Sequence, residues 1–217
     1  SYEGEVSQMT SRVDVGKADS VLKRLHADSE KDGKILMDRI NQDVNSNGHV
    51  YEMISTPTPL SKFINSLIKT EGVDLTVMGS KGRTGAAEVL LGSTTEEITE
   101  SIEGCPLLIV PYEVNFVIPA RIAFASDFNE FYRLSRFKPI TRLVRHYHSE
   151  INIVHVGQES DLGAEQKKNM EKFRNDLSEY DVDFHFVAKK GSISNTLHEF
   201  IDSRNIDFFS SIFHNHT

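Results

Sequence analysis

A glycine-rich run between residues 79 and 93 has the residue types and spacing to bind a phosphate. Its pattern is Gly79-x2-Gly82-x9-Gly92-Ser93. The run follows the alternating residues Leu75 and Val77, which predict a buried β-strand. Because glycine has no Cβ, the N–H groups of such a loop can approach an anion closely. A helical pattern begins at Ser93, and the N-terminus of a helix favours negative charge. We therefore predict a loop that binds the phosphates of a nucleotide; a tight turn without a ligand is the alternative.

The charged residues around this loop favour binding over catalysis. Lys81 and Arg83 bring positive charge to the loop, although exposed basic residues are often merely solvated. Glu96 and Glu97 are placed to cap the helix rather than to act as catalytic groups. No residue near the loop is an obvious base for activating water, and no Ser–His–Asp or Cys–His arrangement stands out. We expect a binding protein and not an enzyme, with slow ATP hydrolysis as the weaker alternative.

The histidine pairs of the chain do not predict a metal centre. His146 and His148 form one pair, and His214 and His216 form another. Neither pair has a cysteine or a carboxylate cluster at convincing ligand spacing. We expect no metal ligands.

Composition limits the classes of partner. The formal net charge of −8 over 217 residues argues against nucleic-acid binding, so a phosphate must be held locally. No apolar run approaches the roughly 20 residues that span a membrane. The only cysteine, Cys105, precedes an apolar strand and is expected to pack as a small hydrophobe. We predict a cytoplasmic protein without membrane partners.

Strand and helix patterns alternate along the chain, which predicts a parallel sheet with helices on its faces. Residues 1–30 have no strand pattern and are interpreted as a mobile arm or a loop insertion. Gly72 ends the helix that begins near Leu60, and Ser93 or Thr94 can cap the helix after the loop. The other expected helices are 31–46, one within 131–148, and 165–180; the other expected strands are 49–55, 107–110, 122–125, 151–156 and 183–187.

An internal repeat accounts for this alternation. Adding 133 to each residue number aligns 31–79 with 164–212 without a gap. The apolar positions agree throughout, and Asp74 falls on Asp207. Two copies of one α/β unit explain this better than chance, and we place them at residues 1–115 and 116–217.

The second copy lacks the glycine loop, and both copies look incomplete. Gly79 aligns with Ile212 and Ser80 with Phe213, side chains that cannot imitate a glycine turn. The first copy lacks a counterpart of the strand that ends before Asp127, and the counterpart of Gly92 would lie beyond Thr217. We expect a segment before Ser1 and another after Thr217.

The glycine spacing after Val77-Met78 resembles the nucleotide-binding motif of the universal stress proteins. The flanking residues agree with that family: Val73-Asp74-Leu75, Leu90-Leu91 and Cys105-Pro106-Leu107-Leu108-Ile109-Val110. The resemblance covers residues 31–112 closely and 120–212 more loosely. The whole chain is therefore similar to a tandem member of the family.

The resemblance implies a Rossmann-like fold, of the adenine nucleotide alpha hydrolase-like type, in two tandem repeats. Each repeat would hold an open parallel sheet of strand order 3-2-1-4-5, with dimer-like pairing through the last strand. ATP, with or without Mg²⁺, would bind at the carboxyl ends of the strands. The residues around its phosphates and ribose would be Met78, Gly79, Ser80, Gly82, Arg83, Gly92, Ser93 and Thr94.

The resemblance also implies contacts to the adenosine, and here the copies differ. Asp127 matches the acidic residue at the end of the family's first strand, and Val156 lies near the adenine-contacting position. The alternative for Asp127 is a helix N-terminal residue or cap without a ligand. One copy thus keeps the phosphate loop and the other the acidic strand end. Either the missing parts lie outside this sequence, or the two parts meet by rearrangement or exchange between chains.

Taken together, these patterns predict a stress-response module that binds adenine nucleotide and acts by regulation. The partners expected are the nucleotide and a second copy of the chain, or the two repeats paired within one chain. A scaffold of the same fold that binds no nucleotide is the alternative.

Overall fold

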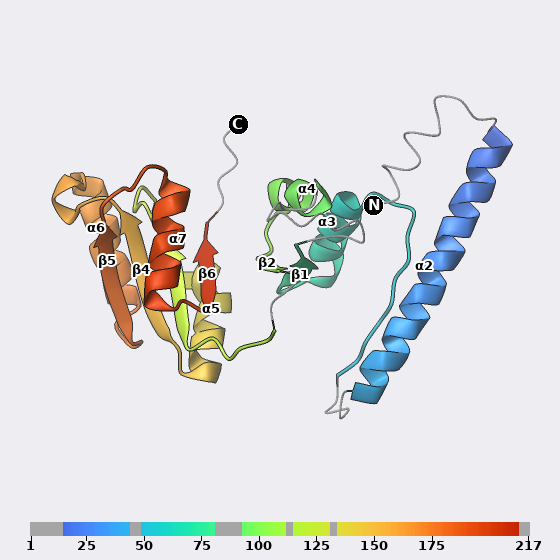
Figure 1. Cartoon of the computed structure of the whole chain (residues 1–217), viewed down its shortest axis with the longest axis horizontal. Coiled ribbons are helices and arrows are strands. Elements are labelled where there is room, and N and C mark those ends of the chain that lie inside the picture. The colour runs from blue at the N-terminus through green and yellow to red at the C-terminus, as the bar shows by residue number, and fades with distance from the viewer. Residues whose placement is uncertain (1–14, 44–48, 81–92, 112–114, 131–133, 213–217) are drawn as a thin grey trace. The chain divides into compact units, whose positions relative to one another are not determined.

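The computed structural model describes residues 15–43, 49–80, 93–111, 115–130 and 134–212. The chain forms two compact units, Ser1–Tyr112 and Glu113–Thr217. Each unit is an α/β assembly with parallel strands, which confirms the predicted fold class (Figure 1).

The second unit contains a sheet of four parallel strands. Its order is β5-β4-β3-β6, which corresponds to the first four positions of the expected 3-2-1-4-5 arrangement. Ile122 of the central strand β3 pairs with Ile151 on one side and with Phe208 on the other. The strands are β3 (Arg121–Ala125), β4 (Glu150–Val156), β5 (Val182–Val187) and β6 (Phe208–Ser211).

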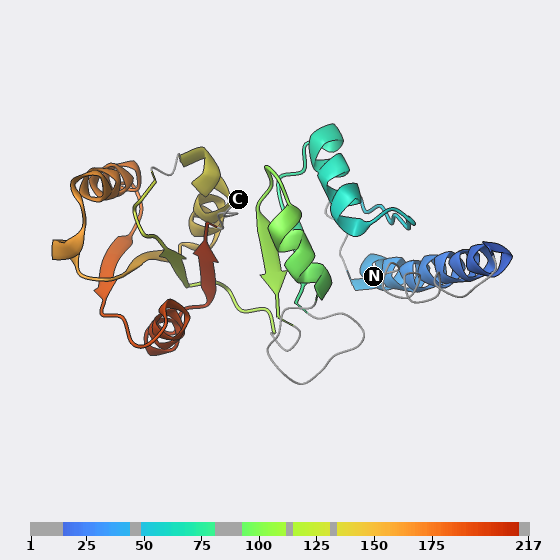
Figure 2. The same ribbon diagram turned by 90° about the horizontal axis from the view of Figure 1, so that it is seen from above.

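Helices cover both faces of this sheet, as Figure 2 shows from above. One face carries α5 (Leu134–Tyr147) and α6 (Ala164–Asp176), and the other carries α7 (Ile193–Arg204). A one-turn helix, η1 (Glu159–Asp161), precedes α6. The larger core lies under α5 and α6 and includes three mutually packed rings, Phe124, Phe137 and Phe173.

The first unit contains a sheet of two parallel strands. Here β1 (Thr76–Gly79) pairs with β2 (Leu107–Val110), with Thr76 opposite Leu107. Two helices accompany the strands, α3 (Leu60–Glu71) and α4 (Ser93–Ser101). The side chain of Asn65 joins the two helices, since it donates to the carbonyl of Ser101 and accepts from the N–H of Glu103.

The long helix α2 (Val15–Asp43) corrects two predictions for the first unit. Residues 15–30 are helical and not a loose arm. The expected strand at 49–55 does not form; instead this extended segment lies along α2 (Figure 1). Met53 packs against Gly33, and the hydroxyl of Ser55 donates to that of Ser29 at 3.2 Å. A strand needs a neighbour to pair with, and residues 18–23, the counterpart of β4, are part of the helix.

The two units share helix boundaries under the shift of 133. Residues 60–71 of α3 become residues 193–204, which are those of α7. Both helices end at a left-handed residue, Gly72 with φ 66° and Asn205 with φ 50°. The last residue of α2, Asp43, falls on the last residue of α6. Other bounds differ: α2 begins at Val15, which aligns with a residue well before the start of α6 at Ala164, and β1 and β6 are offset by one position.

The two units differ in how far their described side chains are buried. Both hydrophobic core clusters belong to the second unit, whereas α3 has no fully buried residue. The strand at Leu75 and Val77 forms, but it is not buried as predicted, because Val77 is 57% exposed. Cys105 is buried with its Sγ 3.5 Å from the hydroxyl oxygen of Thr76, in agreement with the predicted packing role.

Candidate functional site

The carboxyl end of β1 meets the first turn of α4 in the first unit. The hydroxyl of Thr95 donates to the carbonyl of Gly79 at 3.1 Å. On the other side of the strand, the N–H of Ser80 donates to the carbonyl of Val110 at 2.8 Å. These two bonds fix the strand end between β2 and the N-terminus of α4. Backbone N–H groups at a helix start then lie beside the strand end, which is a geometry suited to an anion.

The predicted phosphate-binding residues are divided by this junction. Met78 ends the strand with Gly79, while Ser93 and Thr94 begin α4. The structure thus brings the two ends of the glycine motif to one place. Three of the predicted residues, Gly82, Arg83 and Gly92, lie outside the described residues, as does Lys81.

Asp127 follows β3 directly in the second unit, at the carboxyl edge of the sheet. Its Oδ1 accepts from the N–H of Asn129 at 3.0 Å, and its Oδ2 accepts from the Asn129 side-chain amide at 2.7 Å. Its own carbonyl accepts from the side-chain amide of Gln166 at 2.8 Å. The carboxylate therefore stabilises its own turn. This role is similar to the helix cap that was the alternative prediction for Asp127.

Phe128 adopts a rare backbone conformation next to Asp127. Its φ is 56°, although its ring is buried. A left-handed conformation costs a bulky residue roughly 1–2 kcal/mol. Two hydrogen bonds secure it: its N–H donates to the hydroxyl of Ser126 at 3.1 Å, and its carbonyl accepts from Asn169 at 3.0 Å. The loop after β3 is thus held in one shape by its own serine and by α6.

Val156 lies at the end of β4, the strand beside β3. It pairs with Val187 and is half-buried, so Asp127 and Val156 follow neighbouring strands at one edge. His155, the neighbour of Val156 in β4, contacts the residues on either side of Asp127. Its Nδ1 is 2.9 Å from the carbonyl oxygen of Ser126, and its ring stacks on Phe128 with centroids 5.5 Å apart.

The end of β6 differs from the end of β1. Ser211 is its last residue, and Ile212 packs against the main core at the position that aligns with Gly79. The second unit thus places a core side chain where the first unit has a glycine. Phe213, the counterpart of Ser80, lies outside the described residues.

Two side chains at these sites were not predicted from the sequence. Thr95 is 3% exposed and joins α4 to β1, but a threonine in a helix carries no distinctive sequence signal. The second, His155, was hidden in an apolar strand run, and only the fold shows that its ring covers the turn after β3.

The described residues form neither a metal centre nor a membrane-spanning helix. Within them, no three His, Cys, Asp or Glu side chains converge as metal ligands. Among the described helices, none has the length and apolar character to cross a bilayer.

Comparisons with known proteins agree with the fold. Residues 6–111 match the sequence model of the universal stress protein family. The structure is similar to the crystal structure of a universal stress protein from Archaeoglobus fulgidus DSM 4304, with a TM-score of 0.59 and 17% identity. That similarity covers 92% of this chain and 68% of the solved one. No curated protein sequence matches the chain. Residues 6–111, just under half of the chain, thus match the universal stress protein family in sequence, and the chain shares the parallel α/β fold of a solved universal stress protein.

Proposed function

We propose that this stress-response protein binds an adenine nucleotide, ATP with or without Mg²⁺, at the β1–α4 junction of its first unit. The bond between Thr95 and the carbonyl of Gly79 carries the proposal, because it sets the start of α4 beside the strand end. Phosphate would bind to backbone N–H groups of the loop and of the first turn of α4. Within this site, the contacts are assigned to Met78, Gly79, Ser80, Gly82, Arg83, Gly92, Ser93 and Thr94.

The nucleotide acts as a regulatory ligand and is not turned over. Glu96, the acidic residue in the first turn of α4, stabilises the helix start. Occupancy of the junction would bias conformation or partner choice by the differential affinity of the nucleotide for the two states.

The second unit is a copy of the first that does not hold phosphate in this way. The coincident bounds of α3 and α7 under one shift support the common origin. Ile212 occupies the aligned position of Gly79 and contacts the core. The carboxylate of Asp127, at the family's adenosine-contacting position together with Val156, is already engaged by Asn129. This unit would serve as a structural or interaction module, pairing with the first unit or with a second chain.

Isothermal titration with ATP tests the nucleotide site. We expect binding by the unaltered chain and its loss in Gly82→Val and Gly92→Val, because a branched side chain would fill the space that the phosphate needs. Gly163→Val is the matched control, since Gly163 is exposed in the second unit with an ordinary φ of −66°. No binding by the unaltered chain would contradict the proposal and leave the scaffold function. Phosphate release above the level of Gly92→Val would contradict the regulatory role.

A further inference from the structure

The sheet of the second unit has an open edge along β5. Among the described strands, β4 is the only partner of β5, which is the outermost strand of its sheet (Figure 1). The strand runs from Val182 to Val187 without a proline or a lysine, residues that commonly protect such an edge. Its outer backbone groups are therefore a template for another extended chain.

The hydrogen bonds to β4 show which backbone groups of β5 face outward. The N–H of Ile151 donates to the carbonyl of Asp181, and the N–H of Gly157 donates to the carbonyl of Val187. In a parallel pair, alternate residues direct their backbone groups to the same neighbour. The odd-numbered residues of β5 thus bond to β4, and the even-numbered residues face the open edge. These outward residues are Val182, Phe184 and Phe186.

The side chains of β5 are divided between the two faces of the sheet. Phe184 and Phe186 pack against the larger core, on the face that carries α5 and α6. Asp183 and His185 alternate with them and lie on the face of α7, where the ring of His185 is 5.2 Å from that of Phe200. A strand added at this edge therefore meets aromatic rings on one face and a carboxylate beside an imidazole on the other.

We propose that β5 pairs antiparallel with β5 of a second copy of this chain, about a two-fold axis at Phe184. Asp183 of each copy then lies opposite His185 of the other, and Val182 lies opposite Phe186. The even-numbered residues form the hydrogen-bonded pairs, because their backbone groups face outward. Asp183 and His185 form the non-hydrogen-bonded pairs, in which opposed side chains are closest.

The complementarity of the strand with itself favours a second copy over an unrelated partner. Aromatic rings opposite each other, a β-branched residue opposite a ring, and an acid opposite an imidazole are all stabilising cross-strand pairs. The two-fold axis repeats the last two of these contacts. A shift of the register by two residues would place Asp183 opposite Asp183, or His185 opposite His185, and would lose both acid–imidazole pairs.

This contact differs from the dimer-like pairing through the last strand that the family resemblance implies. In the second unit, β5 and β6 lie at opposite ends of the sheet. The contact is also independent of the nucleotide site in the first unit, so the failure of either proposal leaves the other standing.

Disulfide cross-linking of the full chain tests the pairing and its register together. Asp183→Cys and His185→Cys are prepared as separate variants. Cα atoms of a non-hydrogen-bonded pair are about 4.5 Å apart, which is within disulfide range. With oxidised glutathione, we expect a linked dimer in an equimolar mixture and little in either variant alone. Peptide mapping should locate the bond between positions 183 and 185 and not at Cys105, which is buried.

Hydrogen exchange of the unaltered chain gives a second test that needs no variant to fold. Raising the chain concentration from about 5 to about 500 µM should slow exchange at the even-numbered amides of β5 about tenfold. The odd-numbered amides, already bonded to β4, should not change, and the amides of 122–125 serve as the reference.

A charge reversal locates the contact. Asp183→Lys should raise the concentration needed for protection about tenfold, because each copy loses its acid–imidazole pair. Asp202→Lys makes the same change in charge at an exposed position of α7 and should leave protection unchanged. Absence of the mixed disulfide, equal linkage in either variant alone, or exchange at the even-numbered amides that does not depend on concentration would each overturn the proposal.

Discussion

Replacing Thr95 by valine tests the junction on which the nucleotide site depends. Valine keeps the volume of threonine but removes the hydroxyl that donates to the carbonyl of Gly79. Thr95 is 3% exposed, so water does not readily replace the lost donor. Leaving a buried acceptor without its partner costs about 1–3 kcal/mol. The first turn of α4 is in equilibrium between a state bound to the end of β1 and a detached state. This free energy raises the population of the detached state about five- to 150-fold.

Hydrogen exchange of the α4 amides measures that population directly, because exchange in the fast-closing regime is proportional to the open fraction. We expect the rates for residues 96–98 to rise by this factor in Thr95→Val. Thr99→Val is the matched control, since its hydroxyl donates to the carbonyl of Thr95 within the same helix and not to the strand. Equal increases in the two variants, or none in Thr95→Val, would refute the view that Thr95 joins the helix start to β1.

Three further predictions concern stability. Burial, and to a smaller extent Arg204, lower the pKa of His185, while the charges of Asp183 and Glu150 act in the opposite direction. The neutral His185 therefore contributes its full stabilisation above the ordinary pKa of 6.5, and this contribution is lost as the pH falls below that value. Urea midpoints should decrease from pH 7.5 to pH 5, and the decrease should be smaller in His185→Gln. Gly72→Ala should destabilise the first unit by about 1–2 kcal/mol through its φ of 66°, whereas Gly163→Ala should change urea midpoints little. Phe173→Ala should cost about 3–5 kcal/mol in urea unfolding because its ring is 2% exposed against Phe124 and Phe137, whereas Phe116→Ala, 79% exposed, should cost under about 0.5 kcal/mol.

Short-range patterns predicted most elements correctly. The apolar stripe of α3 and the glycine that ends it are both confirmed, and so is the strand at Leu107–Val110. The run at residues 151–156 is confirmed as a buried central strand, with Ile151 and Ile153 fully buried. These signals succeed because periodicity and helix-ending residues act within a few positions of the chain.

The wrong predictions depended on long-range partners. Residues 49–55 were expected to form a strand, but the described residues of the first unit include no equivalent of β4, the strand that pairs with β5 in the second unit. The first turns of α2 were missed because glycine, serine, aspartate and lysine are scattered there; only the fold reveals that Val21 and Leu25 are half-buried. The bond from Thr95 to Gly79 likewise joins residues separated by a loop, and no spacing rule predicts it.

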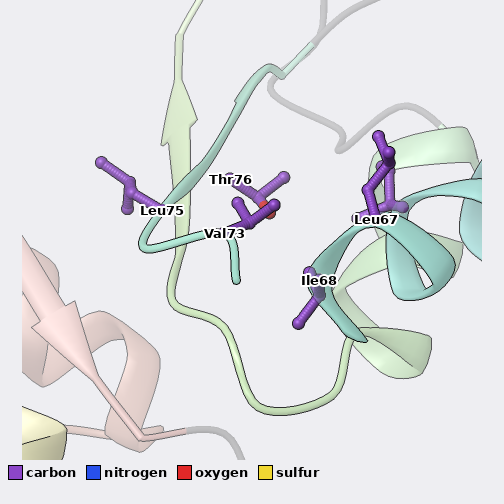
Figure 3. A pocket seen from close by; sticks show the side chains of 6 residues that line it. Leu67, Ile68, Val73, Leu75 and Thr76 are labelled. Carbon is purple, nitrogen blue, oxygen red and sulfur yellow. The ribbon is translucent and has the colours of Figure 1, made fainter. Parts of the chain in front are cut away.

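A comparison of α3 with α7 distinguishes the contribution of the helix pattern to burial from that of the neighbouring strands. Both helices have apolar residues at equivalent positions, and both end at a left-handed residue. Phe200 is nevertheless buried by Ala123 and Val154, whereas its counterpart Leu67 lines an apolar hollow between α3 and the start of β1 (Figure 3). The pattern of a helix therefore determines which face is apolar, but the neighbouring strands determine whether that face is buried.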